Sequence, residues 1–124
     1  MSTRGLYQFT DGEQTINVYK HWDNYPEGAW GFIAAALPYA WELPRFEADD
    51  FAAAFVAANK KQGGGDIRLL NDASTNGDVL GIQYIYKIRK ASGQNAIVVD
   101  CFDTYTGSKV ETRYFEAIKE SEAV

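Results

Sequence analysis

The sequence predicts an α+β protein in which two helices cover one face of a sheet of about six strands. Three observations predict this class. Short runs rich in β-forming residues occur near the N-terminus and through the C-terminal half, apolar residues at helical spacing fill the middle, and glycine-containing turn signals separate the runs. With 124 residues the chain has the usual length of one domain, and we expect residues 1–124 to form a single α+β domain.

Strands are predicted at both ends of the chain. The N-terminal pair, residues 5–10 and 14–22, flanks Asp11 and Gly12, a dipeptide that favours the tight turn of a β-hairpin. Alternation along the second of these runs turns Ile16 and Val18 toward a core, and Tyr19 and His21 toward the opposite face. Four further runs are separated by turn signals and predict a C-terminal antiparallel meander: residues 66–71, 79–89, 96–104 and 109–118.

Two central helices are predicted between these strands. Within residues 27–37 an apolar stripe at i, i+3, i+4 and i+7 consists of Trp30, Ile33, Ala34 and Leu37. Pro38 should end or kink this helix, because proline lacks the backbone donor that the next turn needs. Within residues 47–61 acidic residues begin the segment, lysines end it, and one face carries Phe51, Ala54, Phe55 and Ala58.

Composition excludes several classes of function. The net charge of −5 opposes general binding to nucleic acid or to an anionic membrane. No run of about 18 apolar residues could span a bilayer, so we expect a cytoplasmic protein without membrane contact. The basic residues Lys87, Arg89 and Lys90 are expected to form the solvated end of a strand. The single cysteine, Cys101, lies in an apolar run and is expected to be a buried thiol.

The N-terminal quarter carries a resemblance. The chain begins MSTR, continues through the aspartate–glycine hairpin, and then reads VYKHWDNYPEG. This stretch resembles a widespread family of small uncharacterised proteins of bacteria and their phages, which share an N-terminal Met-Ser-Thr-Arg and a His-Trp-Asp-Gly-Tyr-Pro-Glu-Gly motif. The resemblance covers about thirty residues, and it implies kinship and carriage by a mobile genetic element, with no established activity. Asn24 stands where the family typically has glycine.

Part of this motif has a structural interpretation. Asn24 and Glu27 have the spacing of a capping box, and Pro26 suits the first turn of a helix. His21 and Asp23 are not explained in this way. On an extended chain they point in the same direction, so the carboxylate could orient the imidazole as a general base, or the two could form a structural pair that stabilises the turn. With one histidine and no partner for it, we expect no metal site and no cofactor.

Two further candidates are weaker. Ser2 would carry a free α-amine beside its hydroxyl if Met1 were removed, which is the arrangement of an N-terminal nucleophile. A groove for an anionic or planar ligand could be lined by tyrosines and arginines, although ordinary packing is the favoured explanation of these residues: Tyr19, Tyr25, Tyr84, Tyr86, Arg68 and Arg113.

The sequence therefore favours a small ligand-binding or protein-interaction domain. The expected binding site comprises Arg4, Tyr19, His21, Asp23 and Tyr25, and a small polar or anionic molecule is the expected ligand. The alternative is a small hydrolase or transferase in which His21 is the general base and Asp23 orients it. The many aromatic residues also predict self-association as a homodimer.

Overall fold

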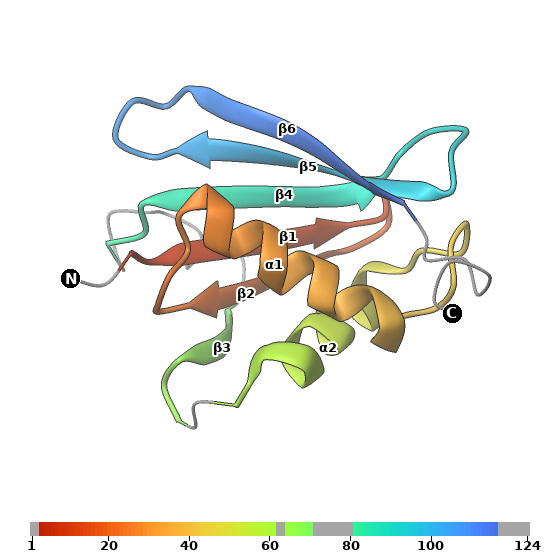
Figure 1. The fold of residues 1–124 in the computed structure, drawn as a ribbon, viewed down its shortest axis with the longest axis horizontal. Helices are drawn as coiled ribbons and strands as arrows, with labels where there is room; N and C mark the ends of the chain where they lie inside the picture. The colour runs from red at the N-terminus through yellow and green to blue at the C-terminus, as the bar shows by residue number, and fades with distance from the viewer. Residues whose placement is uncertain (1–2, 62–63, 71–80, 117–124) are drawn as a thin grey trace.

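One mixed sheet of six strands forms the frame of the protein, in the order β3-β2-β1-β4-β5-β6 (Figure 1). The computed structural model describes residues 3–61, 64–70 and 81–116. Two helices lie across one face of the sheet, and the hydrophobic core fills the space between the two layers. The α+β class expected from the sequence is confirmed.

The N-terminal hairpin forms as predicted. Strands β1 (Gly5–Thr10) and β2 (Thr15–Lys20) pair antiparallel, and Gly12 has a φ of 90° in the turn between them. Asp11 organises this turn, because its Oδ1 accepts the backbone N–H groups of Glu13 and Gln14 at 2.9 and 3.0 Å. The hairpin therefore follows from local chemistry alone.

The strand β1 connects the two halves of the sheet. It pairs in parallel with β4 (Tyr84–Lys90), which continues through β5 (Ala96–Asp103) to β6 (Lys109–Glu116) as an antiparallel meander. The short strand β3 (Ile67–Leu70) lies at the other edge, paired antiparallel with β2. The meander thus contains three of the four C-terminal runs, because turn signals indicate where a chain reverses and not which strand it joins after a long connection.

The helices are α1 (Pro26–Ala36) and α2 (Ala48–Asn59), joined through the 3₁₀ turn η1 (Leu37–Tyr39), which contains Pro38. The predicted face of α2 is buried in full. In α1 the buried residues are Ala29, Trp30, Ile33 and Ala36. Ala34 was expected among them but is exposed, because the buried stripe is centred near Ile33 and each residue turns the helix by about 100°.

Aromatic rings make up much of the core. Tyr7 stacks on Tyr86 with 5.0 Å between ring centroids, and Tyr7 also contacts Phe55 at 4.5 Å. Cys101 lies in the same cluster, as expected, and burial raises the pKa of its thiol to about 11. A second, smaller cluster on the other face of the sheet contains Leu6, Tyr19 and Ile82. Tyr19 and Val18 therefore lie on opposite faces of the sheet, as the alternation predicted.

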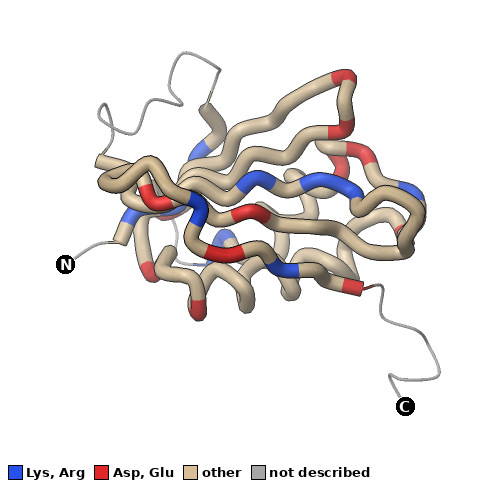
Figure 2. Tube along the Cα trace, turned by 90° about the horizontal axis from the view of Figure 1, so that it is seen from above, with Lys and Arg blue, Asp and Glu red and all other residues tan. Residues whose placement is uncertain are grey.

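Charged residues are mixed over the part of the surface that the structure describes (Figure 2). On the basic segment of β4, Arg89 contacts Asp100 of the neighbouring strand at 2.7 Å, and Lys109 lies 3.8 Å from the same carboxylate. These contacts interrupt the basic run with an acidic partner. None of the described helices has the length and apolar character needed to cross a membrane.

Candidate functional site

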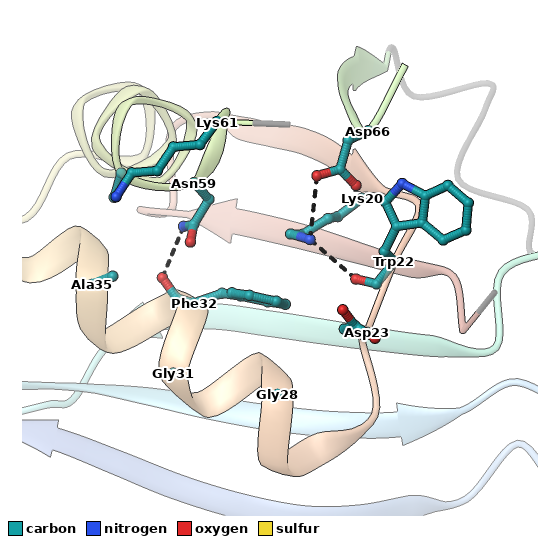
Figure 3. A pocket seen from close by; sticks show the side chains of 11 residues that line it. Lys20, Trp22, Asp23, Gly28, Gly31, Phe32, Ala35, Asn59, Lys61 and Asp66 are labelled. Atoms are coloured by element: carbon teal, nitrogen blue, oxygen red, sulfur yellow. Dashed lines mark hydrogen bonds and ion pairs between the residues drawn. The ribbon is translucent and has the colours of Figure 1, made fainter. Parts of the chain in front are cut away.

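A cavity of about 650 Å³ opens where the end of β2, one face of α1 and the C-terminal end of α2 meet (Figure 3). Its volume lies in the range of small-molecule sites, roughly 300–1,000 Å³. The polar part of its wall comes from three segments of the chain and consists of Lys20, Trp22, Asp23, Asn59, Lys61 and Asp66. Three of these residues belong to or adjoin the motif YKHWDNYPEG.

The innermost charges are Lys20 and Asp66. Their side chains are only 5% and 2% exposed, and Lys20 Nζ lies 3.5 Å from Asp66 Oδ2. Lys20 Nζ donates a hydrogen bond to the carbonyl oxygen of Trp22 at 3.1 Å and stands 4.0 Å from the centre of the Phe32 ring (Figure 3). The ammonium is thus held by a carbonyl, by the Asp66 carboxylate and by an aromatic face.

The carboxylate of Asp66 is incompletely satisfied. Neither of its oxygens accepts a hydrogen bond within the described structure, although both are shielded from solvent. Its backbone oxygen is engaged, because His21 N–H donates to it at 2.8 Å. Buried carboxylates are normally paired and hydrogen-bonded, since desolvating an ion without such compensation costs several kcal/mol. Asp66 therefore holds two buried oxygens that accept no hydrogen bond from the described residues, and its ion pair with Lys20 is the contact that compensates its charge.

Small residues on α1 create the room for this cavity. Gly28, Gly31 and Ala35 line it at successive turns of the helix, beside Phe32. A Cβ atom at Gly28 would overlap the carbonyl oxygen of Asp23, so this position requires glycine. A Cβ atom at Gly31 would meet nothing within 4 Å, because it would point into the open space of the cavity.

Asp23 takes a backbone conformation that the sequence did not predict. The strand β2 ends at Lys20, and Asp23 has a φ of 61°, in the left-handed region. The chain is therefore not extended from His21 to Asp23, and the geometry from which we expected their side chains to point together is wrong. Asp23 lines the cavity with Lys20, whereas His21 does not line it.

His21 contacts aromatic side chains. Its Nδ1 lies 2.6 Å from the hydroxyl of Tyr19, and its ring meets the Trp22 ring edge to face at 4.5 Å. Burial raises the pKa of Tyr19, and its hydroxyl and Nδ1 share one hydrogen bond whose direction depends on the tautomer of His21.

The five residues of the expected binding site are divided among three places. Arg4, Tyr19 and His21 belong to the face of the sheet opposite the helices, where the positive charge of Arg4 lowers the pKa of Tyr19 against the effect of burial. Asp23 lines the cavity. Tyr25 precedes α1 as its N-cap residue and is exposed. Trp22 links the first group to the cavity, because it lines the cavity and its ring meets the His21 ring at 4.5 Å.

The proposed aromatic groove does not assemble either. Arg68 faces Tyr19 across the β2–β3 pair. Arg113 lies on the helix-covered face instead, 5.7 Å from the Trp30 ring centre, and Tyr86 is fully buried in the main core. Arg68 and Arg113 thus occupy opposite faces and opposite edge strands. Ser2 lies outside the described residues, as does the turn at residues 76–77.

Asn24 does not cap the helix. The N-cap residue of α1 is Tyr25, without a side-chain hydrogen bond, so the predicted capping box is wrong. The Asn24 side chain is fully buried, and its Nδ2 lies 2.8–2.9 Å from the backbone oxygens of Thr3, Lys20 and Trp22. Its Oδ1 accepts the hydroxyl of Tyr7 at 2.6 Å. The Asn24 side chain therefore satisfies three buried backbone carbonyls instead of capping the N-terminus of α1.

Four polar residues of the cavity wall were not predicted from the sequence: Lys20, Asn59, Lys61 and Asp66. One signal was present in the sequence, because Lys20 falls on the strand face that Ile16 and Val18 turn toward the core. A lysine at a core-facing position needs a buried counter-charge. Which carboxylate supplies it depends on the pairing of β3 with β2, where Lys20 lies opposite Ile67, the residue after Asp66.

No group of three or more histidine, cysteine or acidic residues within the described residues is arranged to hold a metal ion. Comparison of the chain with known protein families, with curated proteins and with solved structures found no match.

Proposed function

We propose that this protein is a binding domain for a small polar molecule, held in the cavity beside Lys20 and Asp66. The observation that carries the proposal is the cavity itself, about 650 Å³ in volume, which has aromatic and polar walls and a buried ion pair, Lys20 and Asp66, at its inner end. A small polar ligand can bury its apolar part against the rings and exchange hydrogen bonds with the polar groups of the wall.

The composition of the wall supports binding. Phe32 and Trp22 offer aromatic surface, and Asn59, Asp23 and Lys61 offer polar groups, which together can fix the orientation of a ligand. Trp22 and Lys61 are exposed at the mouth, whereas Lys20 and Asp66 lie at the inner end. Self-association and carriage by a mobile genetic element stay predictions.

The catalytic alternative also stays a prediction. A general base must reach the proton that it removes, and His21 does not line the cavity. Its Nδ1 contacts the hydroxyl of Tyr19 on the other face of the sheet. No contact of the described residues favours catalysis at His21 over binding in the cavity.

Native mass spectrometry of the protein purified from cells tests the proposal. We expect an adduct of small mass that disappears in Gly31→Leu, because the leucine side chain would occupy the space into which Gly31 opens. Ala34→Leu is the matched control, since Ala34 is exposed on the same helix and does not line the cavity.

The wild-type protein and the Ala34→Leu control should carry the same adduct in equal amount. An adduct that survives in Gly31→Leu would place binding elsewhere on the molecule. A protein that stays free of adducts, and gains no thermal stability from any member of a broad metabolite library, would refute the proposed function.

A further inference from the structure

We propose that the protein forms a symmetric dimer in which a second copy of the chain covers an apolar groove beside α2. The groove has a volume of about 660 Å³ and is lined by residues of α2, of β2 and of the edge strand β3. Both α2 and β3 lie at the same side of the molecule (Figure 1). In the dimer, α2 of one copy would lie antiparallel against α2 of the other. This inference concerns a surface apart from the cavity and does not depend on the proposed function.

The first argument is the apolar character of the groove. Ile16 and Ile67 line it from the strands, and Ala53 and Val56 line it from the helix. Leu69, on the wall formed by β3, is 71% exposed. A groove of this composition that ends in an exposed leucine is typical of a surface covered by a protein partner.

The second argument is the arrangement of charge along α2, which selects a second copy as the partner. Asp49 and Lys60 line the groove at opposite ends of the helix, about 16 Å apart along its axis. A two-fold axis midway between them would set Asp49 of each copy against the partner's Lys60. The surface is therefore complementary to itself, as the symmetric interface of a homodimer requires.

The same axis also matches the side chains between the two charges. It sets Ala53 of each copy against the partner's Val56, so a small side chain meets a larger one on both sides of the axis. From Asp49 to Lys60 the four residues follow one another at intervals of four, three and four positions. This is the spacing of a helix face that packs against another helix.

The third argument favours contact between helices over pairing of strands at β3. This strand has only four residues, and Lys60 Nζ donates to the carbonyl oxygen of Ile67 at 3.0 Å. A short edge strand with a lysine against its backbone is protected from pairing with another strand. The ammonium has three donors, so Lys60 can keep this bond and also meet the partner's Asp49.

Sedimentation velocity over a range of protein concentrations tests the interface. We expect a reversible monomer–dimer equilibrium with a Kd on the order of 10 μM, because two short helices give a contact at the small end of specific interfaces. Leu69→Ser should raise this Kd at least about tenfold, since it removes an apolar side chain that the dimer buries. Lys87→Glu, a charge reversal on the opposite face of the sheet, is the control and should leave the Kd unchanged.

Two opposite charge reversals give a test that misfolding cannot imitate. Asp49→Lys would bring two ammonium groups together at each end of the interface, and Lys60→Glu would bring two carboxylates together. Each variant alone should therefore be monomeric at concentrations where the wild-type protein is dimeric. An equimolar mixture of the two variants should form a heterodimer, because both contacts then join opposite charges.

The outcomes decide the inference in either direction. A wild-type protein that stays monomeric up to about 1 mM would overturn it. A dimer that keeps its Kd in Leu69→Ser, or a mixture of the two charge-reversal variants that stays monomeric, would also overturn it. Circular dichroism confirms the fold of each variant, and Leu69→Ser decides the question if a charge reversal prevents folding. The adduct experiment is separate, because neither Asp49 nor Lys60 lines the cavity.

Discussion

Asn24 joins three parts of the molecule through one side chain. Its amide reaches the N-terminal segment at Thr3, the end of β2 at Lys20, and the loop at Trp22, while the hydroxyls of Tyr7 and Tyr86 donate to its Oδ1 and its backbone oxygen. The same Trp22 oxygen accepts from Lys20 Nζ. Asn24 therefore positions the carbonyl that holds the inner cation of the cavity.

Asn24→Ala should destabilise the protein by about 2–4 kcal/mol, because it leaves the Tyr7 hydroxyl and several buried carbonyls without partners. Urea unfolding measures the loss. Asn95→Ala, in the exposed turn between β4 and β5, is the control and should change stability by less than about 0.5 kcal/mol. Equal effects of the two variants would show that the hydrogen bonds of Asn24 contribute nothing.

Gly5 is fitted to this arrangement. A Cβ atom at Gly5 would lie 2.6 Å from Cβ of Asn24, so a larger residue would displace the buried amide. Asn24 thus depends on a glycine nearly twenty positions earlier in the chain. The close approach of Gly5 to Asn24 could not be predicted, because a single glycine in a strand leaves no repeating pattern in the sequence that indicates its neighbour.

At the scale of the element, α1 carries two different faces. Its buried stripe, centred near Ile33, follows from the helical period and was predicted in part: Trp30 and Ile33 are buried, whereas Ala34 is exposed. Its second face, with Gly28, Gly31 and Ala35, forms the wall of the cavity. Glycine is a poor helix former, so two glycines within one helix indicate a requirement other than helix stability.

Gly31→Ala should stabilise the protein by roughly 0.5–1 kcal/mol, because alanine loses less backbone freedom on folding and its Cβ meets open space. Gly12→Ala is the matched control. Its Cβ also meets nothing within 4 Å, but the φ of 90° strains any other residue, so this change should lower stability. Thermal unfolding of both variants checks the opposite signs.

The start of α2 is capped by a residue from the first hairpin. Glu47 occupies the N-cap position without a side-chain hydrogen bond, and Asp11 Oδ2 accepts the N–H of Ala48 at 2.9 Å instead. Asp11 Oδ1 accepts the backbone N–H groups of Glu13 and Gln14. The one carboxylate therefore connects the hairpin turn to the start of α2. These backbone donors lower the pKa of Asp11 to about 2.

This lowered pKa predicts a pH dependence. The charged form is favoured in the folded state, so the contribution of Asp11 to stability is complete above its unfolded pKa of 3.8 and is lost as pH falls through about 2. Asp11→Asn should therefore lower the melting temperature by a few degrees near neutral pH and make no difference below about pH 2.

Calorimetry from neutral pH down to about pH 2 measures this dependence. Glu13→Gln, a change of the neighbouring exposed carboxylate, serves as the control for loss of one negative charge. A difference between wild type and Asp11→Asn that stays constant across the whole range would contradict the linkage.

For the molecule as a whole, the parallel pairing of β1 with β4 is the decisive contact. It places Tyr7 opposite Tyr86 and joins the N-terminal hairpin to the C-terminal meander. It also brings Tyr86 within reach of the Asn24 backbone oxygen, at 2.6 Å. The cavity therefore depends on strands that are distant in the chain.

The rates of backbone hydrogen exchange should follow the position of each strand in the sheet. Backbone amides of β1 and β4, at the centre of the sheet and under the helices, should exchange most slowly. Those of the edge strands β3 and β6 should exchange fastest. Exchange measured by NMR checks the ranking, and central strands that exchange as fast as the edges would show that the hairpin and the meander do not unfold as one unit.

Local patterns predicted the elements well. Both helices, the turn at Asp11 and Gly12, the burial of Cys101 and the separate faces of Val18 and Tyr19 follow from periodicity and turn chemistry, which act over a few residues. The backbone beyond Lys20 was not predicted. A left-handed Asp23 and a buried Asn24 satisfy distant partners, and these partners have no local signature.

The amino-acid order alone thus specifies the α+β class, the positions of the strands and helices, and the presence of a lysine on the core side of β2. Tertiary structure alone decides that β3 returns to that edge and sets Asp66 beside Lys20. The physical reason is that burial of an ion pair depends on which segments meet in space. Of the motif YKHWDNYPEG, Asn24 supports the fold, His21 faces away, and Lys20, Trp22 and Asp23 line the cavity.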